Sequence, residues 1–191
     1  DFKIEVRKDA QGDTIFKIGD FETRVLCKGA DQIGSLRGVK FGAYRPDLII
    51  GDDLEDDEMV RNPERRRDFK NLFDEALIPC GDRESCRYIF VGTILHDDCQ
   101  MAKLVSPDFY KEYRKLFYRA RYQNSKGELC SLWPEKWTVE VLNQMERDKP
   151  SVFAKEYQGD PASLSGTKFL REDFRYWKED GDNYCLLNEN G

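Results

Sequence analysis

The stretch LIIGDDLEDDE, residues 48–58, decides the fold that this sequence predicts. Leu48, Ile49 and Ile50 form a continuous apolar run directly after Pro46 and Asp47. A run of this kind, without alternating polar side chains, is typical of a strand that is covered on both faces in a parallel sheet. A glycine follows, and six of the seven residues from 52 to 58 are acidic. The sequence therefore predicts a buried strand that ends in an acidic loop.

A helix and a second strand follow in the order expected for a parallel pair. Asn62 is a suitable helix N-cap, and Pro63 is a suitable first helical residue. Apolar residues then recur on one helical face until a proline and a glycine end the helix: Phe69, Leu72, Phe73, Ala76, Leu77, Pro79 and Gly81. Residues 88–91, before a glycine and Thr93, predict the second strand. Because such connections are right-handed and join parallel strands, we expect an α/β fold with Thr93 and the acidic loop at one sheet edge.

Weaker patterns outline the rest of the chain. Short β-type runs around glycine turns predict hairpins, and apolar residues at helical spacing after a capping residue predict helices. The predicted elements are a hairpin of Thr14–Ile18 and Thr23–Cys27, a loop over 28–46, a strand within 112–122, a helix over 138–148 capped by Thr138, and a shorter helix that ends at Gly159.

The composition excludes several classes of protein. The 191 residues carry 31 basic and 37 acidic side chains, a net charge of −6, so any contact with nucleic acid must be local. The six cysteines form no C-x-x-C pair and there is one histidine, which predicts reduced thiols rather than a zinc site. No apolar run reaches the roughly 18 residues that a membrane span needs. The chain starts at Asp1 without an initiator methionine, and we expect it to be a piece of a longer protein.

The first two acids after the strand are the candidates for chemistry. Asp52 and Asp53 leave the strand in opposite directions, so one can reach a metal ion and the other a water molecule. Two carboxylates about 4 Å apart repel each other by about 4 kcal/mol at an effective dielectric constant of about 20, so an ionised pair needs a nearby cation. Mg²⁺ fits, because it binds carboxylates while keeping water and phosphate oxygens as ligands. We interpret Glu55 to Glu58 as a solvated loop that the following arginines balance.

Basic side chains gather between Lys103 and Arg121, where six of them accompany only two acids. Tyrosines and phenylalanines lie between them. A local excess of four positive charges can follow a phosphate backbone, but a strand with aromatic residues inward and solvated bases outward explains the same pattern. The candidates for contacts with DNA or a neighbouring subunit are Arg37, Lys40, Arg45, Lys115 and Arg119.

Several stretches together resemble one protein family. In chain order they are SLRGVKFGAYRPDLIIGDDLEDDE, NPERRRDFKNLFDEALIP, YIFVGTILHDD, LWPEKW, FAKEYQGDP and GTKFLREDFRYW. Their order and spacing are similar to those of the large terminase subunit of tailed bacteriophages, the viral motor and nuclease that packages DNA into proheads. The resemblance extends along nearly the whole chain. It implies a parallel-sheet P-loop NTPase core of the ASCE type, with flanking helices and a C-terminal linker.

The resemblance also implies roles for three residues. LIIGDD resembles the Walker B strand, so Asp52 would hold Mg²⁺ through its water shell and Asp53 would orient the water that attacks ATP. Many relatives have glutamate where this chain has the shorter Asp53. VGT resembles the coupling motif, in which Thr93 would sense the γ-phosphate. The implied cofactors are Mg²⁺ and ATP.

Two parts of the family's pattern are absent from this sequence. It contains neither a G-x-x-x-x-G-K-[ST] phosphate-binding loop, which is Walker A, nor the ribonuclease-H-like nuclease. The resemblance therefore implies that residues 1–161 are the second half of the ATPase domain and that residues 162–191 are a linker toward the nuclease. Without a phosphate-binding loop most of the charge stabilisation in phosphoryl transfer is lost, so we expect the chain alone to be inactive as an ATPase.

For the whole protein, the resemblance implies ATP-driven movement of double-stranded DNA into the prohead and cleavage of that DNA by an endonuclease. The implied partners are double-stranded DNA, the portal protein, the small terminase subunit and further copies in a ring, in the host cytoplasm. Two alternatives stay open. One is a non-catalytic scaffold or binding module that keeps the ATPase sheet, and the other is a metal-dependent nuclease that uses Asp47, Asp52 and Asp53 directly.

Overall fold

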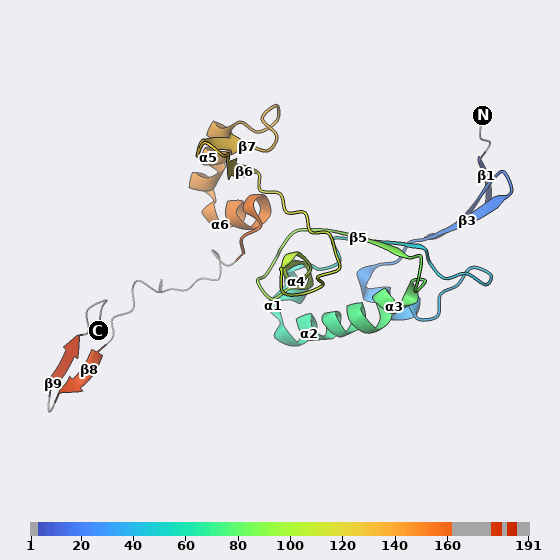
Figure 1. Ribbon diagram of the computed structural model, residues 1–191, viewed down its shortest axis with the longest axis horizontal. Helices are drawn as coiled ribbons and strands as arrows, with labels where there is room; N and C mark the ends of the chain where they lie inside the picture. The colour runs from blue at the N-terminus through green and yellow to red at the C-terminus, as the bar shows by residue number, and fades with distance from the viewer. Residues whose placement is uncertain (1–3, 162–176, 181–182, 187–191) are drawn as a thin grey trace. The chain divides into compact units, whose positions relative to one another are not determined.

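The two predicted strands form a parallel pair. The computed structural model describes residues 4–161, 177–180 and 183–186 (Figure 1). In it β4 (Leu48–Asp52) pairs in parallel with β5 (Arg87–Val91), and the register sets Asp52 opposite Val91. The fold is mixed α/β with small sheets, and β4–β5 is the one parallel pair among the described residues. A complete ASCE core is not found in this part of the chain.

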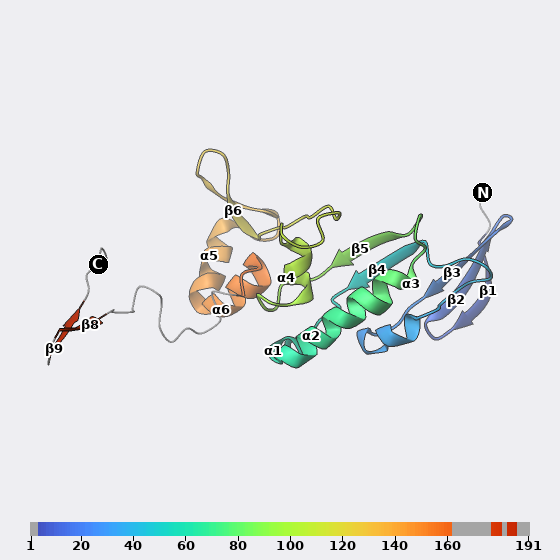
Figure 2. The same ribbon diagram turned by 60° about the horizontal axis from the view of Figure 1, so that its bottom comes forward.

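The helix between the strands begins where the sequence predicts. The side chain of Asn62 accepts hydrogen bonds from the backbone N–H groups of Glu64 and Arg65, and Pro63 is the first residue of α2 (Pro63–Leu72). The helix continues through a π-helical segment, η2 (Phe73–Leu77), into α3 (Ile78–Cys80), and ends at Gly81. Its predicted apolar face is buried and packs against Ile49 of β4. Figures 1 and 2 both show α2 and α3 alongside the strand pair.

Only one face of the pair is covered, which corrects the expectation of burial on both faces. Ile49 is 9% exposed, whereas Leu48 is 49% and Ile50 is 62% exposed. On β5, Ile89 and Val91 are also exposed, at 48% and 54%. The continuous apolar run thus has one face packed against the helix and one face that no described residue buries.

An antiparallel sheet precedes the parallel pair. The predicted hairpin is confirmed as β2 (Asp13–Ile18) and β3 (Phe21–Leu26). A further strand that the sequence does not predict, β1 (Ile4–Ala10), pairs with β2. The predicted loop after it is wrong in part, because η1 (Ala30–Leu36) is a 3₁₀ helix. Ile33 of η1 is 3% exposed and belongs to the core of α2 and β4, and this burial explains the ordered turn.

The chain divides into two compact units, residues 1–117 and 118–191. The second contains β6 (Arg121–Gln123), β7 (Leu129–Ser131), α5 (Val139–Asp148), α6 (Pro150–Val152), the π-helical η3 (Phe153–Tyr157), and a hairpin of β8 (Trp177–Asp180) and β9 (Asn183–Leu186). Leu142 and Phe153 are its most deeply buried described side chains. Thr138 caps α5 as predicted.

The strand predicted within 112–122 is wrong for most of its length. Only Arg121–Gln123 pairs, with Leu129–Ser131, because no other described strand lies beside this segment. The predicted linker over 162–191 lies largely outside the described residues, and the boundary at 161 stays a prediction.

Candidate functional site

Asp52 and Asp53 lie at the carboxyl end of β4, where it meets the carboxyl end of β5. Asp52 is the last residue of the strand and is exposed. Asp53 adopts a φ of 45°, a left-handed conformation that aspartate tolerates better than most residues. Its backbone N–H donates to the carbonyl of Val91 at 3.0 Å. The chain therefore turns sharply at Asp53 while the pairing with β5 continues.

Gly92 lets the end of β5 approach this turn closely. A Cβ atom on Gly92 would lie 3.3 Å from Oδ1 of Asp53 and 3.0 Å from Cε of Met101. Thr93 follows Gly92 and is half-buried, and both residues line a small cavity of about 10 Å³ together with Asp53 and Glu55. The structure thus brings together Asp53 and Thr93, which the sequence predicts at one edge.

Glu55 joins the loop after β4 to α4 (Gln100–Val105). Its two carboxylate oxygens accept hydrogen bonds from the backbone N–H groups of Gln100 at 2.8 Å and Met101 at 2.9 Å. Sγ of Cys99 accepts the next N–H, that of Ala102, at 3.4 Å. The first three N–H groups of α4, which have no partner inside the helix, are therefore all satisfied. This corrects the interpretation of Glu55 as part of a solvated loop.

Other acids of the loop also have local partners. Asp56 caps α1 (Asp57–Arg61) by accepting from the N–H of Met59 at 2.7 Å, and Glu58 pairs with Arg65 on the surface. Asp52 and Asp53 precede these residues and lie at the sheet edge itself. The local N-cap at Asp56 has a sequence signal, whereas the contact of Glu55 spans 45 residues and has none.

A second set of ion pairs holds the segment after Thr93. Asp98 accepts from Nζ of Lys103 and from Nε of Arg66, which lies on α2. These two cations, with Lys103 contributing most, lower the pKa of Asp98 below its usual value. Val60, Ile94 and Cys99 form a buried cluster beneath the same segment. Ion pairs and apolar packing therefore hold the segment after Thr93 against α1 and α2.

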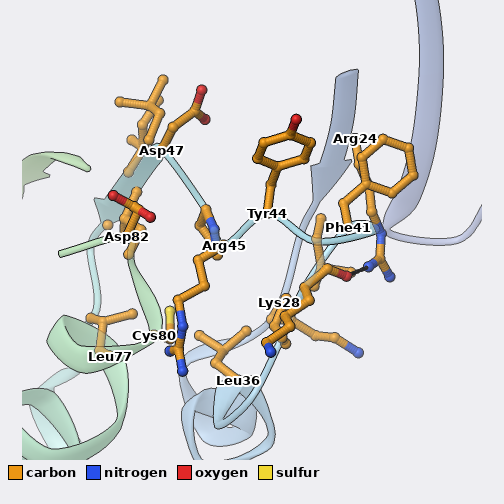
Figure 3. Close-up of a pocket in the computed structure, with 18 of the residues that line it drawn as sticks. Arg24, Lys28, Leu36, Phe41, Tyr44, Arg45, Asp47, Leu77, Cys80 and Asp82 are labelled. Carbon is orange, nitrogen blue, oxygen red and sulfur yellow. Dashed lines mark hydrogen bonds between the residues drawn. The ribbon is translucent and has the colours of Figure 1, made fainter. Parts of the chain in front are cut away.

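A larger cavity of about 440 Å³ lies beside the open edge of β4 (Figure 3). One wall is formed by β3 and another by β4, and Ile33, Leu77 and Cys80 contribute apolar lining. Arg45 extends along this cavity toward Cys80, and its guanidinium donates to the carbonyl of Pro79 at 3.1 Å. No local sequence signal indicated this cavity, because its walls come from segments far apart in the chain.

The other candidate contact residues come from both units. Arg37 is exposed and pairs with Glu75 at 3.6 Å. Nζ of Lys115 donates to the backbone carbonyls of Ser106 and Phe109 in the first unit, and Arg119 is exposed in the second. Lys40 lines the cavity of Figure 3 together with Arg45. Contacts of these residues with DNA or a subunit stay predictions.

The edge offers an exposed carboxylate but no loop for a triphosphate among the described residues. Asp52 offers an exposed carboxylate at a strand end, which suits a metal ion that keeps most of its water shell. Among the described residues no group of three His, Cys, Asp or Glu side chains could hold a metal ion. No backbone loop in the described part of the chain carries the lysine and glycines that surround the β- and γ-phosphates. The groups that would hold a triphosphate are therefore not found among the residues that the structure describes.

Asp47 does not join the edge. It precedes β4, and the five residue steps to Asp52 correspond to about 16 Å in an extended strand. A pair of metal ions in a nuclease site lies only about 4 Å apart. Asp47 is thus too far from Asp52 and Asp53 to join them in the direct metal-dependent nuclease site, the second alternative from the sequence.

Comparisons of the chain with family models, with curated proteins and with solved structures give no match. No helix in the described ranges has the length and apolar character needed to cross a bilayer.

Proposed function

We propose that this chain is part of a viral DNA-packaging ATPase similar to the large terminase subunit. In this proposal Asp52 binds Mg²⁺ through water, Asp53 orients the attacking water, and Thr93 responds to the γ-phosphate. The observation that carries the proposal is the junction of the two parallel strands, where Asp53 donates its N–H to Val91 and lies against Gly92. Ligands of open α/β sheets bind at this end of the strands.

The uncovered face of β4–β5 also supports the proposal. Four aliphatic side chains on that face are about half exposed, and a soluble protein rarely leaves such a face without cover. The outer edge of β4 pairs with no described strand and borders the cavity in Figure 3. Both features are expected of a strand pair from the interior of a larger sheet. The proposal requires that further strands, and the phosphate-binding loop, come from residues outside this sequence.

The remaining elements of the proposal follow from the family resemblance. The native protein would hydrolyse Mg·ATP, move double-stranded DNA and carry a separate endonuclease, as a ring docked on the portal with the small terminase subunit. The ATPase activity would therefore belong to the native protein, and this chain would contribute the acids and the coupling segment.

The test is ATP turnover by the native protein that contains this chain. We expect Asp53→Asn to lower kcat at least about 100-fold, because general-base catalysis contributes about 10²–10⁴-fold. Binding of Mg·ATP should change less than about threefold, because the metal is assigned to Asp52. Glu58→Gln is the matched control, since this side chain is 81% exposed and pairs only on the surface. Unchanged kcat in Asp53→Asn would overturn the proposal.

A further inference from the structure

Gln100 carries a buried polar atom that no described residue satisfies. The residue is 4% exposed, and its Oε1 has no hydrogen-bond partner. It lines the small cavity that Asp53, Gly92 and Thr93 also line. Buried side-chain oxygens nearly always have a partner, and an unpaired one indicates a missing water or ligand. The cavity, at about 10 Å³, is at the lower limit of the space that one water needs.

The other side of the amide begins a chain of hydrogen bonds. Nε2 of Gln100 donates to the hydroxyl of Tyr110 at 2.7 Å, and that hydroxyl donates to Oδ1 of Asp74 at 2.7 Å. Oδ2 of Asp74 accepts from Nζ of Lys70 at 2.6 Å. Asp74 and Lys70 belong to η2 and α2, the helix that packs on the strand pair.

This chain fixes the orientation of the amide. The hydroxyl proton of Tyr110 is used by the carboxylate of Asp74, so the hydroxyl can only accept from Gln100, and Nε2 must face it. Burial, with Asp74 as a further cause, raises the pKa of Tyr110, which keeps the hydroxyl proton in place. Tyr110 also has a φ of 43°, a strained backbone conformation for a tyrosine that tertiary contacts must hold. Oε1 is therefore the end of the amide that remains for a partner on the other side.

We propose that Gln100 is a positioning residue that links the Asp53–Thr93 edge to α2 and η2. Its Oε1 accepts a hydrogen bond from one water, and the hydroxyl of Thr93 is the second partner of that water. A change at Thr93 then reaches Lys70 through Gln100, Tyr110 and Asp74. The inference rests on the proposed function in one respect only: a nucleotide phosphate is the cause that we expect for a change at Thr93.

The test uses the side-chain amide NMR signals of Gln100 in the chain without nucleotide. We expect Tyr110→Phe to move these signals, because it removes the direct acceptor, and this variant serves as the positive control. Thr93→Val should also move them, because it removes the hydroxyl that holds the water. Thr93→Ser, which keeps the hydroxyl, should leave them near their original positions. Signals that move in Tyr110→Phe but stay in place in Thr93→Val would overturn the proposal.

A measurement on the unmodified chain tests the proposal even if Thr93→Val does not fold. We expect cross-relaxation between the Gln100 amide protons and a long-lived water. The absence of this signal would also overturn the proposal. ATP turnover of the native protein separates the two inferences. If the Gln100 signals respond to Thr93→Val but Asp53→Asn leaves kcat unchanged, the proposed function fails and the positioning role stands.

Discussion

Replacement of Glu55 by alanine tests the contact that joins the loop after β4 to α4. The two carboxylate oxygens accept the N–H groups of Gln100 and Met101, so Glu55→Ala leaves both donors at the helix start without a protein partner. Hydrogen bonds to a charged group contribute about 1.5–3 kcal/mol each. Glu55 is half-buried, and water can replace part of the loss. We therefore expect the free energy of unfolding of the first unit to fall by about 2–3 kcal/mol.

Two further variants define that prediction. Glu55→Gln keeps one acceptor oxygen and removes the charge, so we expect a loss of about 1 kcal/mol. Glu58→Ala removes an exposed acid three positions away in the same loop, and its surface pair with Arg65 contributes at most about 0.5 kcal/mol. A loss of stability that decreases in the order Glu55→Ala, Glu55→Gln, Glu58→Ala would distinguish a specific contact from a general effect of negative charge.

The assay must report on the first unit. All three tryptophans, Trp133, Trp137 and Trp177, lie in residues 118–191, so tryptophan fluorescence would follow the second unit. Native-state hydrogen exchange of the β4 and β5 amides in increasing urea measures the opening of the first unit directly. A loss below about 0.5 kcal/mol for Glu55→Ala, or one equal to that of Glu58→Ala, would refute the reasoning.

Three further variants test the fold around the site. Phe73→Ala should cost about 3–5 kcal/mol in urea unfolding, because the ring is fully buried against Phe90 and the cavity cannot close. Asn62→Ala should cost about 1 kcal/mol through loss of the α2 cap, whereas Asn71→Ala, exposed on the same helix, should cost nothing measurable. Asp98→Asn should lower the melting temperature near neutral pH. Because the folded-state pKa of Asp98 is lowered, its stabilisation is present above about pH 4 and disappears as the pH falls through that pKa, so the two melting curves should converge in acid.

Local signals account for the parts of the fold that the sequence predicts correctly. The apolar run before Asp52, the cap at Asn62 and the apolar face of α2 each depend on neighbouring residues, and the parallel pairing follows from the handedness of strand–helix–strand connections. The position of Asp53 beside Gly92 follows in turn, because parallel strands end at the same edge.

Long-range contacts account for what the sequence could not predict. Glu55 accepts a hydrogen bond from a backbone N–H group 45 residues away. The acidic residues around it in the sequence indicated a solvated side chain, whereas this contact makes it a helix cap. The chain from Gln100 to Asp74 likewise joins residues from separate segments. The basic and aromatic stretch over 112–122 is mostly not a strand, because a strand needs a neighbouring strand to pair with. Among the described residues only Arg121–Gln123 has such a partner.

The most direct test of the magnesium-binding edge uses Mn²⁺ as a paramagnetic substitute for Mg²⁺ on this chain. Mn²⁺ broadens the amide signals of residues near its site, and we expect the strongest broadening at Asp52, Asp53, Gly92 and Thr93. Asp52→Asn should abolish that pattern, while Glu58→Gln should leave it intact. Broadening centred elsewhere on the acidic loop, or a pattern that Asp52→Asn does not change, would contradict the account.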